Sequence, residues 1–126
     1  MKYKGLSLFA NVGIAETYLK DIKFPIVLAN ELLPDRVKFY EHLHGHRAIT
    51  GSITDDNVFN NIVEKAKKLG VNFILATPPC QGMSIAGKMK EDDPRNTLII
   101  KAMKVFKELM PEFMLIENVP QMFKTS

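Results

Sequence analysis

A single cysteine stands in a local sequence that suits a nucleophile. Cys80 lies within residues 77–84, Thr-Pro-Pro-Cys-Gln-Gly-Met-Ser, where two prolines restrict the chain before the thiol and a glycine leaves space after it. A thiolate is a good nucleophile when cationic or dipolar neighbours lower its pKa. A lone cysteine is more often a small buried hydrophobic residue, but a loop rich in proline and glycine suits that role poorly. The segment therefore favours a reactive Cys80.

A glutamate near the end of the chain is a candidate acid. Glu117 follows a short apolar run and precedes Asn118. If desolvated, its carboxyl group could hold a proton and donate it to a ring nitrogen, while Asn118 could brace a nearby loop. The alternative is a carboxylate at a strand end that caps the chain or pairs with lysine.

The first polar turn of the chain is a candidate cofactor site. Residues 9–14, Phe-Ala-Asn-Val-Gly-Ile, join an apolar run to a helical pattern, an arrangement that lets backbone approach a nucleotide. Glu31 lies about twenty residues further on, where an acid reaches a ribose diol. Only one glycine of a G-x-G-x-x-G pattern is present, so an ordinary turn with a solvated Glu31 is the alternative.

Short apolar runs alternate with segments of helical period, and these elements must position the candidates. The predicted strands are 5–10, 26–29, 48–50, 71–76 and 113–116. The predicted helices are 14–21, 34–43, a stretch from about 58 to 69, and 98–109. This alternation predicts an α/β fold, a parallel sheet with helices on both faces. Asn11, Glu31, Cys80 and Glu117 all follow the carboxyl end of a strand, the edge where such sheets bind ligands.

Composition and charge limit the class of protein. The chain has 126 residues, 46% hydrophobic and 25% charged, which predicts one folded domain. No apolar run approaches the roughly 18–20 residues of a membrane span, and the first residues do not fit a signal peptide. One cysteine cannot form an internal disulfide, so we expect a free thiol and a cytoplasmic protein. A net charge of +3 permits an anionic partner without requiring one.

Three alternating histidines stand where a helix is predicted to end. His42, His44 and His46 surround Gly45, and no cysteine or carboxylate at ligand spacing accompanies them. We therefore expect no metal site, and we expect the histidines to cap helix carbonyls and interact with the helix dipole.

Together, the two reactive motifs resemble those of the cytosine-C5 DNA methyltransferase family. Pro-Pro-Cys-Gln-Gly-Met-Ser at 78–84 is followed, in the family's order and spacing, by Glu-Asn-Val at 117–119. The turn at 9–14 resembles the family's cofactor motif, and Asp-Pro-Arg-Asn at 93–96 resembles its Asp-x-Arg segment. The resemblance implies a Rossmann-like methyltransferase sheet that uses S-adenosylmethionine and is incomplete at its C-terminal end.

The resemblance also implies a role for each matching residue. Cys80 would add to C6 of a cytosine flipped out of double-stranded DNA, and Glu117 would stabilise charge on the ring, while Asn118 would brace the nearby loop. The implied cofactor-binding residues are Phe9, Asn11, Gly13, Glu31, Ser52, Ile53 and Pro78. The implied substrate-binding residues are Pro79, Gln81, Ser84 and Arg95, although a solvated surface arginine is an equal alternative for the last.

Three positions depart from the family pattern. Asn11 and Ile14 stand where the family has glycines, and Ser52 stands where it has an acid that contacts adenine. Asparagine tolerates a left-handed backbone, whereas Ile14 must be helical. Ser52 can accept a hydrogen bond but lacks the charge, so we expect weaker or differently shaped adenosine binding.

The 126 residues correspond to roughly the first third of a complete family member. We expect residues 1–126 to be the N-terminal part of a catalytic domain, the target recognition region and C-terminal part being absent. The chain would then be a fragment, one half of a split enzyme with a complementing C-terminal polypeptide, or a remnant. The setting implied is bacterial restriction–modification, in the cytoplasm or nucleoid. The alternatives are a non-catalytic cofactor-binding or scaffolding protein, a tRNA cytosine methyltransferase and, least favoured, a redox thiol protein without a resolving cysteine.

Overall fold

Strands and helices alternate along the chain in the computed structural model, which describes residues 2–11, 13–78 and 97–117. The strands are β1 (Gly5–Leu8), β2 (Ile26–Glu31), β3 (Ala48–Thr50), β4 (Phe73–Ala76) and β5 (Phe113–Ile116). The helices are α1 (Ile14–Asp21), α2 (Pro34–His44), α3 (Asp56–Leu69) and α4 (Thr97–Leu109). None of these helices is long and apolar enough to cross a membrane.

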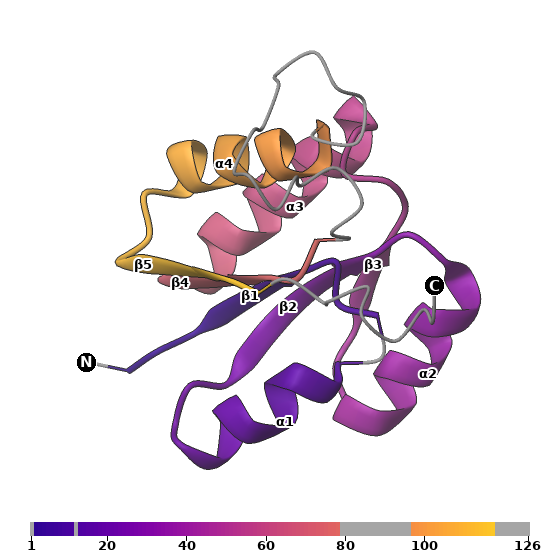
Figure 1. Ribbon diagram of the computed structural model, residues 1–126, viewed down its shortest axis with the longest axis vertical. Coiled ribbons are helices and arrows are strands. Elements are labelled where there is room, and N and C mark those ends of the chain that lie inside the picture. Colours follow the sequence, from indigo (N-terminus) through magenta and orange to yellow (C-terminus); the bar gives the residue numbers. More distant parts are fainter. Residues whose placement is uncertain (1, 12, 79–96, 118–126) are drawn as a thin grey trace, which may run out of the picture.

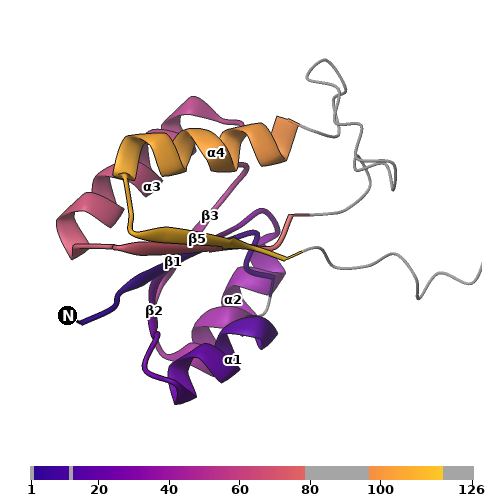
Figure 2. The same ribbon diagram turned by 60° about the vertical axis from the view of Figure 1, so that its left-hand side comes forward.

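The strands form one parallel sheet in the order β3-β2-β1-β4-β5. Helices α1 and α2 cover one face, and α3 and α4 cover the other (Figure 1), as the turned view in Figure 2 also shows. The predicted α/β sheet is therefore confirmed. Because β2 and β4 flank β1 on opposite sides, the strand order reverses there, and a crevice is expected at the carboxyl ends.

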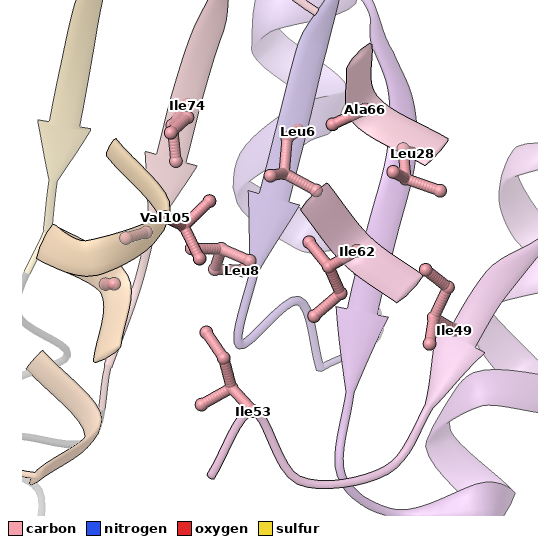
Figure 3. Close-up of a cluster of buried hydrophobic side chains, with 11 residues drawn as sticks. Leu6, Leu8, Leu28, Ile49, Ile53, Ile62, Ala66, Ile74 and Val105 are labelled. Atoms are coloured by element: carbon pink, nitrogen blue, oxygen red, sulfur yellow. The ribbon is translucent and has the colours of Figure 1, made fainter. Parts of the chain in front are cut away.

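The largest apolar cluster lies between the sheet and the α3–α4 layer. Leu6 and Leu8 of β1 and Ile74 of β4 are fully buried and point toward this layer (Figure 3). Ile62 of α3 and Val105 of α4, also fully buried, meet them from above. This packing fixes the position of β1 and β4 within the sheet.

The opposite face of the sheet carries an aromatic cluster. The rings of Phe73 and Phe113 stack, with centroids 5.3 Å apart and 13° between their planes. Tyr3 and Phe24 pack edge-on against them and lie tilted against each other, and Leu19 of α1 joins the cluster. Strands β4 and β5 are thus held together by side chains as well as by their backbone ladder.

The predicted helix ends are confirmed, and one additional cap is present. Gly45 and Gly70 end α2 and α3 with left-handed backbones. At the start of α3, the Asp55 carboxylate accepts hydrogen bonds from the N–H groups of Asn57 and Val58, at 2.8 and 3.3 Å. This cap places the first residues of α3 two positions before the predicted apolar stripe.

Two predicted strands were too long. The strand predicted at 5–10 ends at Leu8, because Phe9 adopts a left-handed conformation with φ 58°. The strand predicted at 71–76 begins at Phe73. The Val71 N–H closes α3 by donating to the Ala66 carbonyl at 3.0 Å, so Val71 belongs to the helix end.

Replacing Ile62 tests the packing of the α3–α4 layer. Ile62→Ala should lower the free energy of unfolding by about 2–5 kcal/mol, because it leaves a cavity beneath a fully buried helix position. Leu69→Ala, on the same helix but 41% exposed, should cost clearly less. Urea unfolding of both variants measures the difference, and equal losses would contradict the assignment of Ile62 to the core.

Candidate cofactor and active site

The chain turns sharply after β1 through two left-handed residues that are not glycine. Phe9 has φ 58° and Asn11 has φ 55°, a conformation that costs about 1–2 kcal/mol for a residue with a Cβ atom. The Phe9 carbonyl accepts the hydroxyl of Thr77 at 2.9 Å, and the Asn11 N–H donates to Glu31 Oε1 at 2.8 Å. The turn is thus tied to the ends of both neighbouring strands. As expected from the sequence, Asn11 is left-handed and Ile14 is the first helical residue.

Glu31 is the buried carboxylate of this edge and is only 5% exposed. Its Oε1 accepts the Asn11 N–H, and its Oε2 accepts the Leu33 N–H at 3.0 Å. The Arg36 guanidinium lies 4.0 Å from the same Oε2. A carboxylate has about four acceptor positions, so Glu31 keeps capacity for hydroxyl groups of a ligand.

A pocket of about 410 Å³ opens beside this turn. Its volume is within the range of small-molecule sites, about 300–1,000 Å³. Five of the residues predicted to bind cofactor line it: Phe9, Asn11, Glu31, Ser52 and Ile53. The structure therefore brings together residues from three separate strand–helix connections.

The far wall of the pocket is the loop after β3. The Asn30 carboxamide donates to the carbonyls of Ile49 and Gly51, at 2.8 and 3.0 Å, which ties this loop to β2. Ser52 accepts the Thr54 N–H at 3.1 Å and shares a hydroxyl–hydroxyl hydrogen bond with Thr54 at 2.6 Å. The Ser52 hydroxyl is therefore held in place and offers a polar group without charge.

Gly13 and Pro78, also predicted to bind cofactor, are not among the residues that line the pocket. Gly13 stands at the N-terminus of α1 with φ 78°, facing α2. A Cβ atom there would lie 2.3 Å from His44 Nε2 and 2.7 Å from Tyr40 Cε2. The glycine lets α1 and the polar turn pack against α2, while Pro78 is fully buried.

A buried polar cluster connects α1, the helix that follows the turn, with α2. Glu16 of α1 is 4% exposed and accepts the Tyr40 hydroxyl, which also lies 3.3 Å from His46 Nε2. Burial raises the pKa of the Glu16 carboxyl, and burial and Glu16 both raise the pKa of the Tyr40 phenol, which stays protonated and donates. Burial lowers the pKa of His46.

The C-terminal end of α2 is closed by a backbone hydrogen bond, and His46 lies against Tyr40. The Gly45 N–H closes α2 by donating to the Glu41 carbonyl at 2.9 Å, while the His46 ring turns back to Tyr40. Across the part of the chain that the structure describes, no three His, Cys, Asp or Glu side chains are grouped as metal ligands.

The ends of β1, β4 and β5 lie side by side at the carboxyl edge. The Thr77 N–H donates to the Leu8 carbonyl at 3.3 Å, and the Glu117 N–H donates to the Ala76 carbonyl at 2.9 Å. The Glu117 side chain is exposed. The other predicted catalytic and substrate-binding residues lie outside the described residues: Pro79, Cys80, Gln81, Ser84, Arg95 and Asn118.

Seven pocket residues were missed from the sequence: Asn30, Leu32, Leu33, Arg36, Gly51, Thr77 and Leu98. Asn30 and Thr77 stand at carboxyl ends of strands, the signal that selected Glu31, and could have been found in the same way. Leu33 acts through its backbone N–H, and Arg36 reaches the pocket from the first turn of α2, so neither has a sequence signal of its own.

Comparison with known protein families agrees with this geometry. Residues 3–126 match the family model described as C-5 cytosine-specific DNA methylase. The chain belongs to this family. The predicted resemblance to cytosine-C5 DNA methyltransferases is therefore confirmed.

Two curated relatives show how much of a methylase the chain covers. It is 40% identical over 126 residues to the type II methyltransferase M1.HgaI of Avibacterium volantium, covering 95% of this chain and 35% of that protein. It is 30% identical over 131 residues to M.AquIA of Picosynechococcus, covering 100% of this chain and 52% of that protein. The chain thus spans about a third to a half of these relatives.

Solved structures show the same fold. A putative DNA modification methyltransferase encoded within an E. coli prophage matches 97% of this chain with a TM-score of 0.71 and 22% identity. The Dnmt2 methyltransferase of S. pombe matches 98% with a TM-score of 0.66 and 21% identity. This chain covers 33% and 36% of those two chains, respectively.

Replacing Glu31 tests its role in the pocket. Glu31→Gln in the methylase should weaken binding of S-adenosylhomocysteine at least about tenfold, because an amide has only one acceptor oxygen for two backbone donors and the ligand. Asp35→Asn, an exposed acid in the first turn of α2, is the matched control. Calorimetric titration measures the affinity of wild type and of both variants. Unchanged affinity in Glu31→Gln would exclude this carboxylate from the ligand site.

Replacing Glu16 tests the buried cluster. Because the pKa of Glu16 is raised in the folded state, its contribution to stability is greatest below its ordinary value of 4.5 and falls as pH rises through the folded value. Glu16→Gln keeps the acceptor for Tyr40 and removes this fall. The variant should therefore gain stability relative to wild type as pH rises from acidic to neutral.

The lowered pKa of His46 has the opposite effect on the pH dependence of stability: it adds stability as pH rises toward 6.5. This effect is present in both wild type and Glu16→Gln. The comparison is therefore the difference between Glu16→Gln and wild type, measured by denaturant unfolding at several pH values. Glu64→Gln, at an exposed position of α3, is the control and should show little change. Parallel pH profiles for wild type and Glu16→Gln would contradict the burial of an ionisable Glu16.

Proposed function

We propose that this chain is the cofactor-binding and nucleophile-bearing part of a DNA (cytosine-5-)-methyltransferase that uses S-adenosylmethionine. One observation carries the proposal: a pocket at the carboxyl edge of the sheet contains a buried, doubly hydrogen-bonded Glu31, in a chain that belongs to the methylase family. The pocket is also next to the strand end that leads to Cys80.

The residues of the pocket suit an adenosine group. The free acceptor positions of Glu31 would take the ribose hydroxyls, and Phe9 and Leu32 would supply apolar surface to the adenine. Ser52 would offer a hydrogen bond to the adenine edge in place of the acid of other family members. When bound, S-adenosylmethionine supplies an electrophilic methyl group.

Cys80 and Glu117 would carry the chemistry on the acceptor base. Cytosine C5 is too weak a nucleophile to take a methyl group directly, so the Cys80 thiolate would add to C6 and turn the ring into an enamine. Glu117 would stabilise charge at N3 and the exocyclic amine, and Asn118 would brace the nearby loop. Once C5 carries the methyl group, loss of the C5 proton to water and departure of the Cys80 thiolate from C6 would restore the aromatic ring.

Double-stranded DNA is the proposed acceptor, and its cytosine must leave the stack to reach Cys80. Pro79, Gln81 and Ser84 would contact the flipped base, and Arg95 would contact phosphate. A net charge of +3 is small for clamping a duplex, so most of the DNA affinity would come from polypeptide beyond these residues. Both curated relatives described above are named type II methyltransferases, which favours a restriction–modification setting in a bacterial cytoplasm or nucleoid.

The remaining part of the enzyme would complete the sheet next to β5. Leu115 and Ile116 are 43% and 44% exposed, and among the described residues no strand pairs with the outer edge of β5. An exposed apolar strand edge is a site for pairing with another segment. Further strands, on a longer chain or on a complementing C-terminal polypeptide, would cover it.

Replacing the nucleophile tests the proposal. In the enzyme as its host makes it, Cys80→Ser should reduce methyl transfer to DNA by at least about a thousandfold and abolish the covalent adduct with DNA containing 5-fluorocytosine, because a serine hydroxyl is not ionised at neutral pH. Met103→Leu, at an exposed position of α4, is the control and should keep full activity. Radiolabelled methyl transfer measures both.

Each contrary outcome points to a particular alternative. Full activity in Cys80→Ser would exclude Cys80 as the nucleophile. Cofactor binding without methyl transfer or adduct in the wild-type enzyme would favour a non-catalytic cofactor-binding protein. Transfer to tRNA in preference to DNA would favour the tRNA branch.

A further inference from the structure

We infer that Thr77 is a positioning residue that ties the cofactor turn to the segment carrying the nucleophile, through the hydrogen bond from its hydroxyl to the Phe9 carbonyl. The inference deepens the proposed function and rests on it. Nothing in the sequence motifs singles out Thr77, because its neighbours 78–84 carry the resemblance and Thr77 itself precedes them.

The geometry around Thr77 extends the pairing of β1 and β4 beyond the end of β1. The last backbone pair of the two strands is Leu8 with Ala76, and the Thr77 N–H still donates to the Leu8 carbonyl at 3.3 Å. One residue later Phe9 has left the extended conformation, so a regular ladder cannot continue. The Thr77 hydroxyl replaces the missing ladder bond by donating to the Phe9 carbonyl at 2.9 Å.

The local sequence fixes the direction of this hydroxyl. Pro78 restricts the backbone of the residue before it to extended conformations, and Pro78 is itself fully buried. Threonine is branched at Cβ, so its first side-chain torsion has few allowed values. The hydroxyl of Thr77 is therefore held toward the Phe9 carbonyl by stiffness on both sides.

Two hydrogen bonds hold the strained turn, and they connect it to different strands. Glu31 ties Asn11 to β2, which flanks β1 on the side opposite to β4. Thr77 ties Phe9 to β4, and Cys80 follows Thr77 by three residues. Thr77 also lines the pocket itself. Loss of its hydroxyl would therefore leave the Phe9 carbonyl without this donor and loosen the pocket and the cysteine segment together.

The test compares two substitutions at Thr77 in the enzyme as its host makes it. Thr77→Val keeps the shape and removes the donor, and Thr77→Ser keeps the donor. Thr77→Val should raise the KM for S-adenosylmethionine and lower kcat, each about tenfold, because both partners of the bond shift when it is lost. Thr77→Ser should stay within about twofold of wild type in both parameters. Assays are run well below the melting temperature of every variant.

Thr50→Val, on the exposed end of edge strand β3, is the matched control for the loss of a threonine hydroxyl and should change neither parameter. A lower melting temperature in Thr77→Val with unchanged KM and kcat would show a purely structural role and overturn the inference. A change in only one of the two parameters would also overturn it, because the hydroxyl would then serve only one site. If the wild-type enzyme transfers no methyl group to DNA, the proposed function fails instead.

Discussion

The site depends on a turn that the chain can hold only because neighbouring strands stabilise it. Phe9 and Asn11 both adopt left-handed backbones, which residues with a Cβ atom disfavour. Each is held by a side chain from a different strand end, Thr77 beyond β4 and Glu31 at the end of β2. The turn is therefore a product of the tertiary structure and would not persist in an isolated peptide.

The order of the strands explains why these two side chains are available. Because β1 is the central strand, its carboxyl end has a neighbour on each side, and the reversal of strand order keeps both connecting helices away from it. The α3–α4 layer anchors β1 and β4 through Leu8, Ile74 and Val105. On the other face, Gly13 allows α1 to sit close to Tyr40, whose hydroxyl binds the buried Glu16. The pocket thus has firm support from both layers.

The sequence was sufficient for the architecture and for much of the pocket, because both depend on strand ends. Apolar runs located every strand, and Asn11 and Glu31 were selected because they follow such runs. Ser52 was selected from the resemblance to the methyltransferase family. The left-handed Phe9 was not predicted, since a large aromatic residue gives no local signal for that conformation. The burial of Glu16 was also not predicted, because its partner Tyr40 lies on another helix and is brought to it only by the packing of α1 on α2.

The distribution of charge suggests that different parts of the proposed enzyme bind the cofactor and the DNA. Glu31 and Arg36 are the charged side chains that line the pocket, and they lie close enough to offset one another. A ligand would therefore be selected there by hydroxyl acceptors and apolar surface more than by net charge, which suits an uncharged adenosine group. Binding of the DNA polyanion instead requires a large positively charged surface. If the proposed function holds, this part of the chain would recognise the cofactor at the carboxyl ends of its strands. Polypeptide beyond these residues would supply most of the electrostatic attraction for DNA.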